Sequence, residues 1–285
     1  MLFLFLLHLS LTLWVFAHSI ACKKERIIVK IAVVNSDQRM QAVYFNLCKT
    51  YDTYLINEFT NMDKLTIPDV LVLPMFGPDD KGIMTIKGQQ LAIPMSFWAS
   101  LGDHTKVFCG LPNAFIKELA YDCDFYMEHA RLIEQNAVLT AEGTLCLLID
   151  HTAKSIKDCQ VDVIGYGTCG KEIVKWLKAL EVPTRIVRRV CQGEPDSISI
   201  DEWKAEGCGD VIINTAPAKI IDRRLMESWN PAPLIIDIAS GALIDEKDAM
   251  LCGIQLIKAK ALPAIYAWKS AGNIIAETIR EELKS

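Results

Sequence analysis

Short apolar runs bounded by turn residues alternate with stretches of helical period along most of this chain. Strands that are buried on both faces read as such runs, and helices between them indicate parallel connections. The runs fall into two groups. The first predicts strands at residues 29–34, 53–56, 70–73 and 106–109, and the second predicts strands at residues 161–164, 185–187, 211–213, 234–236 and 255–257.

Helical patterns complete the first group and connect it to the second. One helix is predicted after Asp37 and another after Asn113. A linking helix is expected within residues 140–155, and its apolar spacing predicts which side chains are buried: Leu145, Leu148 and Ile149. Residues 77–102 have no clear period and carry several Gly and Pro residues, so a long loop or lid is expected there.

One predicted strand, residues 161–164, runs directly into the sequence Gly-Tyr-Gly-Thr-Cys-Gly. In a strand-turn-helix unit Gly165 permits the tight turn, Gly167 lets the backbone approach a pyrophosphate, and Gly170 lets the helix pack on the strand. The strand before, the helical period after and a second strand at residues 184–187 favour a dinucleotide site over an ordinary corner. The residues expected to line it are Gly165, Tyr166, Gly167, Thr168, Cys169 and Gly170.

The residues after the second strand of this unit indicate which dinucleotide binds. A site for NAD usually places Asp or Glu there, whereas a site for NADP offers arginine to the 2'-phosphate. This chain has Arg188 and Arg189, with no carboxylate before Glu194. Two guanidiniums suit a phosphate dianion. NADP is therefore predicted, NAD stays the alternative, and a solvated basic turn is the interpretation without a ligand.

These elements predict an α/β protein with two doubly wound lobes, and 285 residues with 51% hydrophobic content can fill two cores. The first lobe is expected to be flavodoxin-like or Rossmann-like, and the second to be a Rossmann domain that binds NAD(P). The expected division is an apolar segment at 1–26, an N-terminal α/β domain at 27–139, a linking helix at 140–155, the Rossmann domain at 156–262, and a C-terminal helix at 263–285 packing back on the first domain.

Composition narrows the class of protein. The net charge of -5 and the absence of a basic stripe with interleaved aromatics exclude a general nucleic-acid surface. The ten cysteines occur as scattered singlets, which argues against zinc, iron-sulfur and disulfide frameworks, so no metal is predicted and the thiols are expected to be reduced, as in the cytoplasm. A helix N-terminus would lower the pKa of Cys169, although a small filler beside the cofactor is the simpler interpretation.

The N-terminal segment does not fit this composition. Residues 2–20 are almost continuously apolar and are followed by Lys23, Lys24 and Arg26, which is typical of a membrane span with its basic flank inside. A secretory signal is disfavoured because no basic residue precedes the run. The preferred hypothesis is a reading frame extended upstream of the true start, because the first core strand begins only at residue 29. No membrane is expected for the core domains.

Ligands of open α/β sheets bind beyond the carboxyl ends of the strands, so the residues there are candidates. Arg39 and Asn113 follow strands of the first group. Two segments follow strands of the second group, and a simple turn in which Thr215 caps the next helix is the alternative. The cofactor contacts expected from these two segments are Asn214, Thr215, Ala216, Pro217, Asp237 and Ala239.

Over nearly the whole chain after residue 26, these residues resemble the dipicolinate synthase A-chain family of spore-forming bacteria. The matching pieces are Asp37-Gln-Arg39, Leu73-Pro74, Gly110-Leu-Pro-Asn113-Ala, Thr140-Ala-Glu142-Gly143-Thr144, His151-Thr152, Gly165 to Gly170, Asn214 to Pro217, Asp237 to Ser240, Leu262-Pro263 and Lys269-Ser-Ala-Gly272. The resemblance implies a nicotinamide-dependent oxidation of dihydrodipicolinate to dipicolinate (pyridine-2,6-dicarboxylate) during sporulation, in the mother-cell cytoplasm, with a flavoprotein-like second subunit of the synthase. The chain departs from the family at Ala267-Trp268, because the family pattern has a proline before the lysine and this chain has Trp268 there.

This chemistry requires the loss of a hydride and a proton from the ring while two carboxylates are held. Arg39 and Lys269 are the cations expected at the carboxylates of this small dicarboxylate substrate, and Lys269 is also placed in the catalytic group. Its alternative is a solvated surface lysine. Further substrate contacts are expected from the amides at the start of the linking helix and from one side chain: Gly143, Thr144 and Asn113.

The proton acceptor is expected to be His151 or Glu142, and a histidine pKa near the working pH favours His151. The structural alternatives are a packed or capping histidine and a first-turn acid favoured by the helix dipole. Two other functions stay open: a 2-hydroxy or 2-amino acid dehydrogenase, and a non-catalytic protein that binds NADP for its partner. The sequence leaves room for a homo-oligomer.

Overall fold

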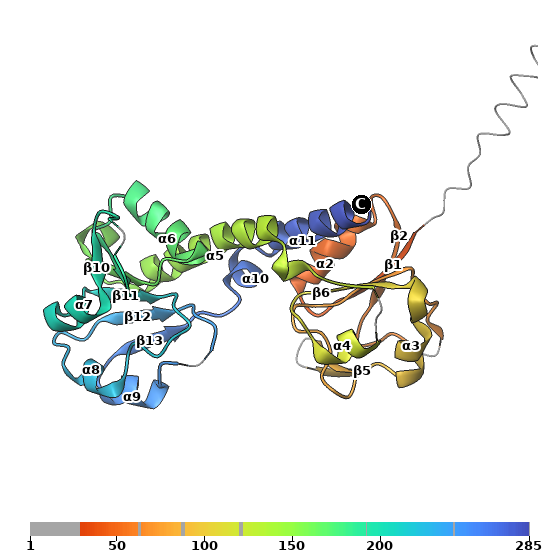
Figure 1. Ribbon diagram of the computed structural model, residues 1–285, viewed down its shortest axis with the longest axis horizontal. Helices are drawn as coiled ribbons and strands as arrows, with labels where there is room; N and C mark the ends of the chain where they lie inside the picture. Colours follow the sequence, from red (N-terminus) through yellow and green to blue (C-terminus); the bar gives the residue numbers. More distant parts are fainter. Residues whose placement is uncertain are drawn as a thin grey trace, which may run out of the picture.

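Two parallel sheets form the centres of two lobes in the computed structural model (Figure 1). The structure describes residues 29–61, 64–86, 89–119, 122–191, 193–241 and 243–284. The apolar segment at residues 1–26, with its two interpretations, lies outside the described residues.

The first sheet has five parallel strands in the order β2-β1-β3-β6-β7. Its strands are β1 (Lys30–Val34), β2 (Asp52–Ile56), β3 (Val70–Val72), β6 (Lys106–Cys109) and β7 (Asp122–Phe125). Helix α2 (Gln38–Leu47) follows β1, and α4 (Ala114–Leu119) follows β6, as predicted. Because separate apolar clusters cover its two faces, the central strands β1, β3 and β6 read as largely apolar runs.

The expectation of a long loop at residues 77–102 is wrong. This segment forms an antiparallel hairpin of β4 (Ile83–Ile86) and β5 (Gln89–Ala92), then α3 (Met95–Ser100) and the short 3-10 helix η2 (Gly102–His104). Met84, Ile86 and Leu91 are buried in the first core. Their alternation is the period-2 signal of a half-buried hairpin, which the Gly and Pro residues around it obscured.

The second sheet has six parallel strands in the order β10-β9-β8-β11-β12-β13. This is the doubly wound 3-2-1-4-5-6 order of dinucleotide-binding sheets. Its strands are β8 (Val161–Ile164), β9 (Thr184–Arg188), β10 (Ser197–Ser199), β11 (Val211–Asn214), β12 (Leu234–Asp237) and β13 (Gln255–Lys258). The helices of this lobe are α6 (Thr168–Ala179), α7 (Ile200–Glu206), α8 (Arg223–Glu227) and α9 (Glu246–Leu251).

Helix α5 (Ala130–His151) reaches both lobes, packing on α6 in the second and on α11 (Trp268–Glu282) beside the first (Figure 1). The 3-10 helices η3 (Tyr126–Glu128) and η4 (Ile156–Asp158) flank it. Helix α5 therefore begins at Ala130, well before residue 140, where the predicted linking helix begins. Leu145 and Leu148 are buried as expected, but Ile149 is 59% exposed, so its predicted burial is wrong.

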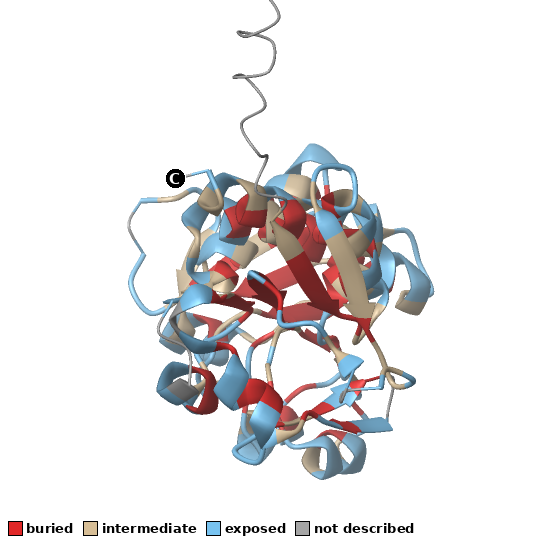
Figure 2. Cartoon of the chain, turned by 90° about the vertical axis from the view of Figure 1, so that its right-hand side faces the viewer, coloured by how far each residue is buried: buried red, intermediate tan, exposed pale blue. Residues whose placement is uncertain are grey.

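Two glycines let the connecting helices approach closely. A β-carbon on Gly143 would lie 2.9 Å from Cβ of Leu262, at the start of α10 (Leu262–Tyr266). A β-carbon on Gly272 in α11 would lie 2.5 Å from Cβ of Ala42 in α2. The C-terminal helix thus packs on the first helix of the chain. Figure 2 shows the central strands of the first lobe mostly in red, as buried residues, and the exposed residues of the surrounding helices and loops in pale blue.

Helix α5 is also the one helix among the described residues that is long and apolar enough to cross a membrane, by length and composition. Over its most apolar window, 56% is buried inside the protein. Its apolar side chains, such as Ala141, Leu145 and Leu148, pack in the core of the second lobe. That packing explains the apolar composition of α5.

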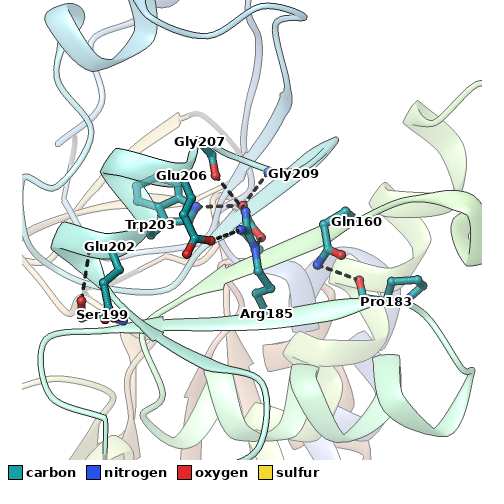
Figure 3. Close-up of polar contacts among 10 residues, drawn as sticks. Gln160, Pro183, Arg185, Ser199, Glu202, Trp203, Glu206, Gly207 and Gly209 are labelled. Carbon is teal, nitrogen blue, oxygen red and sulfur yellow. Dashed lines mark hydrogen bonds and ion pairs between the residues drawn. The ribbon is translucent and has the colours of Figure 1, made fainter.

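An ion pair fixes the amino ends of the second sheet, as Figure 3 shows around Arg185. Asp162 in β8 is fully buried and receives hydrogen bonds from Nε and Nη2 of Arg185 at 2.7 and 2.9 Å. The indole of Trp203 and the amide of Gly209 also donate to it. The buried carboxylate of Asp162 is therefore fully hydrogen-bonded. It lies at the amino ends of the strands, whereas the glycine loop lies at their carboxyl ends.

Candidate nucleotide-binding and active site

The glycine loop joins β8 to α6, and two of its three glycines are required by the protein's own packing. Gly165 has φ +94°, and a β-carbon there would meet Oγ1 of Thr215 at 2.6 Å. A β-carbon on Gly170 would meet the carbonyl oxygen of Gly165 at 2.4 Å. Gly167 differs, because its φ is -80° and a β-carbon would meet no heavy atom of the described residues within 4 Å. Among the described residues neither backbone strain nor packing explains this glycine, and a glycine at this position of such a loop is the one that lets a pyrophosphate approach the backbone.

The start of α6 carries the electrostatic features of an anion site. Gly167 is its N-cap and provides no side-chain hydrogen bond, and the first turn contains no acidic residue. Lys171, exposed in that first turn, lies with its Nζ 5.8 Å from the ring centroid of Tyr166. A lysine there opposes the helix dipole, which a bound anion would compensate. The sequence interpretation missed Lys171, although a basic first turn after a glycine loop was a readable signal.

The predicted arginines lie at the end of β9 beside this loop. Nη1 of Arg188 donates to Oε1 of Glu194 at 2.6 Å, and Cζ of Arg188 lies 5.4 Å from the ring centroid of Tyr166. Arg189 is exposed and has no partner in the part of the chain that the structure describes. A cavity of about 830 Å³ lies here, lined by Gly165, Tyr166, Gly167, Arg188, Arg189, Thr215, Ala216 and Pro217 with several apolar side chains.

The ends of β11 and β12 bring the other predicted cofactor residues together. Nδ2 of Asn214 donates to Oδ1 of Asp237 at 2.8 Å, and the Ala239 amide donates to the same oxygen at 3.3 Å. Asn214 and Asp237 are 2% and 3% exposed. Thr215 Oγ1 donates to the Ile164 carbonyl, which ties this segment to the glycine loop. The expectation that Thr215 caps a following helix is not met, because α8 begins only after its N-cap Asp222.

The structure contradicts a helix-activated thiol at Cys169. Burial raises the pKa of this thiol, and a side-chain hydrogen bond with Thr140 opposes the rise only in part. Cys169 is partly buried between the start of α6 and α5. Cys169 is therefore better described by the simpler interpretation, in which it is a small side chain that fills space at the start of α6.

Helix α5 passes the glycine loop, and a cavity of about 590 Å³ between them is lined partly by Val138, Gly167 and Lys171. Because α5 begins at Ala130, Gly143 and Thr144 lie in its interior, where amides bond to carbonyls four residues earlier. The prediction that their amides bind substrate is wrong. Thr144 is fully buried, and its hydroxyl donates to the Thr140 carbonyl.

The two proton-acceptor candidates lie in different parts of α5. Glu142 is partly buried on α5, two positions after Thr140, which contacts Cys169, and directly before Gly143, which contacts α10. It is not a first-turn acid, and it has no partner among the described residues. Val138, which lines the cavity, lies one turn earlier on the same helix face.

His151 lies at the far end of α5. It is eleven positions beyond Thr140, which corresponds to about 16 Å along a helix. Three residues later Lys154 pairs with Asp210 at 3.0 Å, immediately before β11, at the amino ends of the strands. His151 Nδ1 lies 3.0 Å from the Leu147 carbonyl. This position fits the packed or capping histidine of the alternative, and it disfavours His151 as the base because cofactors of such sheets bind at the carboxyl ends of the strands.

The first lobe has its own cavity of about 530 Å³ at the carboxyl ends of β1 and β3. Arg39 lies in its wall, 14% exposed, with Nη2 2.6 Å from Oδ2 of Asp37. Asp37 also caps α2 through the amides of Arg39 and Met40. The guanidinium keeps Nη1 for another anion, but its charge is already shared with Asp37.

Asn113 holds this cavity's wall and does not face a ligand. Its Nδ2 donates to the carbonyls of Phe76 and Pro78, and its Oδ1 accepts from the Ile116 amide. Both amide hydrogens are therefore used. The predicted substrate contact is corrected to a role in positioning the 76–78 loop, on which Phe76 is 77% exposed.

Lys269 is exposed at the start of α11, with Nζ 5.3 Å from the Trp268 ring centroid. It lies one turn before Gly272, whose β-carbon position is 2.5 Å from the Arg39 carbonyl oxygen. Positions 269 and 272 share a helix face. Lys269 and Arg39 are thus brought to the neighbouring starts of α11 and α2.

No protein-family model matches the chain. It is 27% identical over 284 residues to the dipicolinate synthase A chain of Bacillus subtilis, an alignment covering 90% of this chain and 96% of that protein. A crystal structure of the B. subtilis A chain is 26% identical with a TM-score of 0.79, covering 90% and 96% of the two chains. The corresponding structure from Bacillus halodurans, at 22% identity, has a TM-score of 0.80 and coverages of 90% and 98%.

Dehydrogenases share the fold at lower similarity. An NADPH-dependent glyoxylate/hydroxypyruvate reductase from Sinorhizobium meliloti, solved with NADP and malonate, is 12% identical with a TM-score of 0.53, covering 90% of this chain and 94% of that one. The predicted α/β architecture with two lobes and a Rossmann-like second sheet is therefore confirmed. In sequence and in fold, over nine-tenths of its length, this chain is similar to the A chain of dipicolinate synthase.

Proposed function

We propose that this chain is a nicotinamide-nucleotide-dependent oxidoreductase, the component of a dipicolinate synthase that oxidises dihydrodipicolinate to dipicolinate during sporulation. The observation that carries the proposal is Gly167, whose missing side chain neither packing nor backbone geometry explains. The uncapped start of α6 and exposed Lys171 beside it supply amides and charge for a pyrophosphate.

The residues present fit a nicotinamide nucleotide. When bound, its ring would accept the hydride that the substrate loses. The glycine loop and Lys171 would hold the pyrophosphate, and Arg189, free of any partner among the described residues, would bind a 2'-phosphate. NADP is therefore the cofactor that we favour over NAD. Asn214 and Asp237 would orient the nicotinamide end through their shared hydrogen bond.

The substrate is a six-membered ring with two carboxylates that becomes planar on oxidation, and the first lobe offers groups for each part. Arg39 and Lys269, at the starts of α2 and α11, would hold carboxylates through charge-assisted bonds. In the described structure, Oγ of Ser36 in the same cavity wall is buried without a hydrogen-bond partner. The exposed ring of Phe76 provides an apolar face beside them.

Glu142 is the group that we propose as proton acceptor. The ring loses a hydride from one carbon and a proton, so a group that accepts the proton is required. Glu142 is a partly buried carboxylate on α5, one turn after Val138, which lines the cavity beside the start of α6. Aromatisation favours the product, so a base of ordinary strength suffices.

The experiment is a coupled measurement of hydride transfer. Freshly generated dihydrodipicolinate is mixed with the purified chain and NADP or NAD, and nicotinamide reduction is followed with and without the flavoprotein-like second subunit of the synthase. Reduction supports the proposal, and reduction that requires the second subunit would make the active enzyme a two-component complex. Failure with both cofactors in the presence of the second subunit would reject it.

A further inference from the structure

Arg188 and Arg189 enter the same cavity in different electrostatic states. Arg188 is ion-paired with Glu194 at 2.6 Å, and the two side chains are 19% and 27% exposed. Its guanidinium also lies against the Tyr166 ring, which fixes its position beside the glycine loop. Arg189 is exposed, and none of the described residues pairs with it. Arg189 thus presents a full positive charge to the cavity, whereas the charge of Arg188 is largely balanced by Glu194.

The carboxylate of Glu194 would respond differently to the two nucleotides. A 2'-phosphate carries nearly two negative charges and must share Arg188 with this carboxylate at short range, so the two anions repel. A 2'-hydroxyl is a hydrogen-bond donor that a carboxylate in this position can accept. Glu194 therefore penalises the phosphorylated nucleotide and favours the unphosphorylated one.

We propose that Glu194 is a specificity-determining residue, which lowers the preference for a 2'-phosphate and lets the cavity accept both classes of nucleotide. The inference rests on the proposed function, in which this cavity holds the adenosine half of the cofactor. It adds a residue outside the expected arginines, six positions beyond Arg188, that acts through that arginine.

The test uses two fragments that differ only in the 2'-phosphate, adenosine 2',5'-bisphosphate and adenosine 5'-monophosphate. Their Kd values are measured by calorimetry for the wild type, Glu194→Gln and Glu194→Ser. Glu227→Gln is the matched control, because Glu227 also pairs with an arginine, Arg223 at 2.8 Å, on the exposed helix α8. Both Glu194 variants should shift the preference toward the bisphosphate about tenfold, and the control should keep the wild-type ratio.

The outcomes separate the two levels of the proposal. An unchanged ratio in a folded Glu194 variant, with a wild type that binds either fragment, overturns the role of Glu194 and leaves the cofactor site standing. A wild type that binds neither fragment, NADP nor NAD rejects the proposed function itself. Circular dichroism of each variant checks that it is folded. Two substitutions at Glu194 are used so that the test can still be made if one variant does not fold.

Discussion

Gly170 and Gly165 are so close that a β-carbon on Gly170 would lie 2.4 Å from the Gly165 carbonyl oxygen. This contact seats α6 against the end of β8, and it involves backbone that cannot move aside without displacing the helix. Gly167, between them, has open space where its side chain would be. Gly165 and Gly170 are therefore required by packing within the protein, whereas we attribute Gly167 to the close approach of a ligand.

Alanine at these two positions should separate the demands. We expect Gly170→Ala to lower the free energy of unfolding by about 1–3 kcal/mol or more, the usual cost of overpacking. Gly167→Ala should change it by less than about 1 kcal/mol, because its backbone is unstrained, yet should weaken nucleotide binding at least about tenfold. Urea denaturation and nucleotide titration measure both quantities. Undiminished binding by Gly167→Ala would contradict this account of the loop.

Arg189→Ala should lower the affinity for NADP by about 10- to 100-fold, because a charge-assisted hydrogen bond to phosphate contributes about 1.5–3 kcal/mol. NAD affinity should change little. Arg131, 59% exposed at the start of α5, provides the matched arginine-to-alanine control. Equal losses for the two nucleotides would show that Arg189 does not bind the 2'-phosphate.

The two proton-acceptor candidates make opposite predictions. Glu142→Gln should lower kcat by about 10²- to 10⁴-fold, the usual contribution of general base catalysis. His151→Gln should leave kcat within about twofold, because His151 lies about 16 Å farther along the same helix than the Thr140 contact. Steady-state oxidation of dihydrodipicolinate measures both. Loss of activity in the histidine variant alone would reinstate His151.

The two acid partners of Arg185 should differ in their contribution to stability. Removing one partner of a buried pair leaves an uncompensated charge, so Asp162→Ala should cost about 3–5 kcal/mol. Glu206 contacts the same arginine at 3.4 Å but is 62% exposed, so Glu206→Ala should cost less than about 1 kcal/mol. Chemical denaturation of both variants tests this comparison. A similar cost for both would mean that burial does not govern this network.

Cys169 should react slowly with alkylating agents at neutral pH. Because burial raises the pKa of its thiol, less thiolate is present at any pH below that value. Exposed Cys48, Cys146 and Cys191 are the internal controls. Mass spectrometry after timed iodoacetamide treatment at about pH 7.5 should find Cys169 modified after these three. Its preferential early labelling would point to an activated thiol instead.

Most strands of both lobes could be predicted from the sequence, because a strand that is buried on both faces consists almost entirely of apolar residues. Short strands lacked that signal. The strand β7 reads Asp-Cys-Asp-Phe and is only partly buried, and β10 reads Ser-Ile-Ser, so neither stands out from a loop. Their pairing depends on neighbouring strands far away in the sequence.

The site residues were predictable where the glycine loop fixes them and failed where topology decides. Thr140, Gly143 and Thr144 read as a helix opening, but α5 starts at Ala130 because the preceding residues already carry helical spacing. That change placed the amides of Gly143 and Thr144 inside the helix. His151 lies at the amino ends of the strands because the topology of the second lobe places the end of α5 there, which no local pattern could indicate.

The measurement that tests the central claim most directly is an equilibrium titration of the folded wild-type chain with NADP and NAD. The account predicts saturable uptake of one nucleotide per chain, tighter for NADP, that Gly167→Ala weakens without unfolding the protein. Absence of uptake of either nucleotide by correctly folded protein would contradict it.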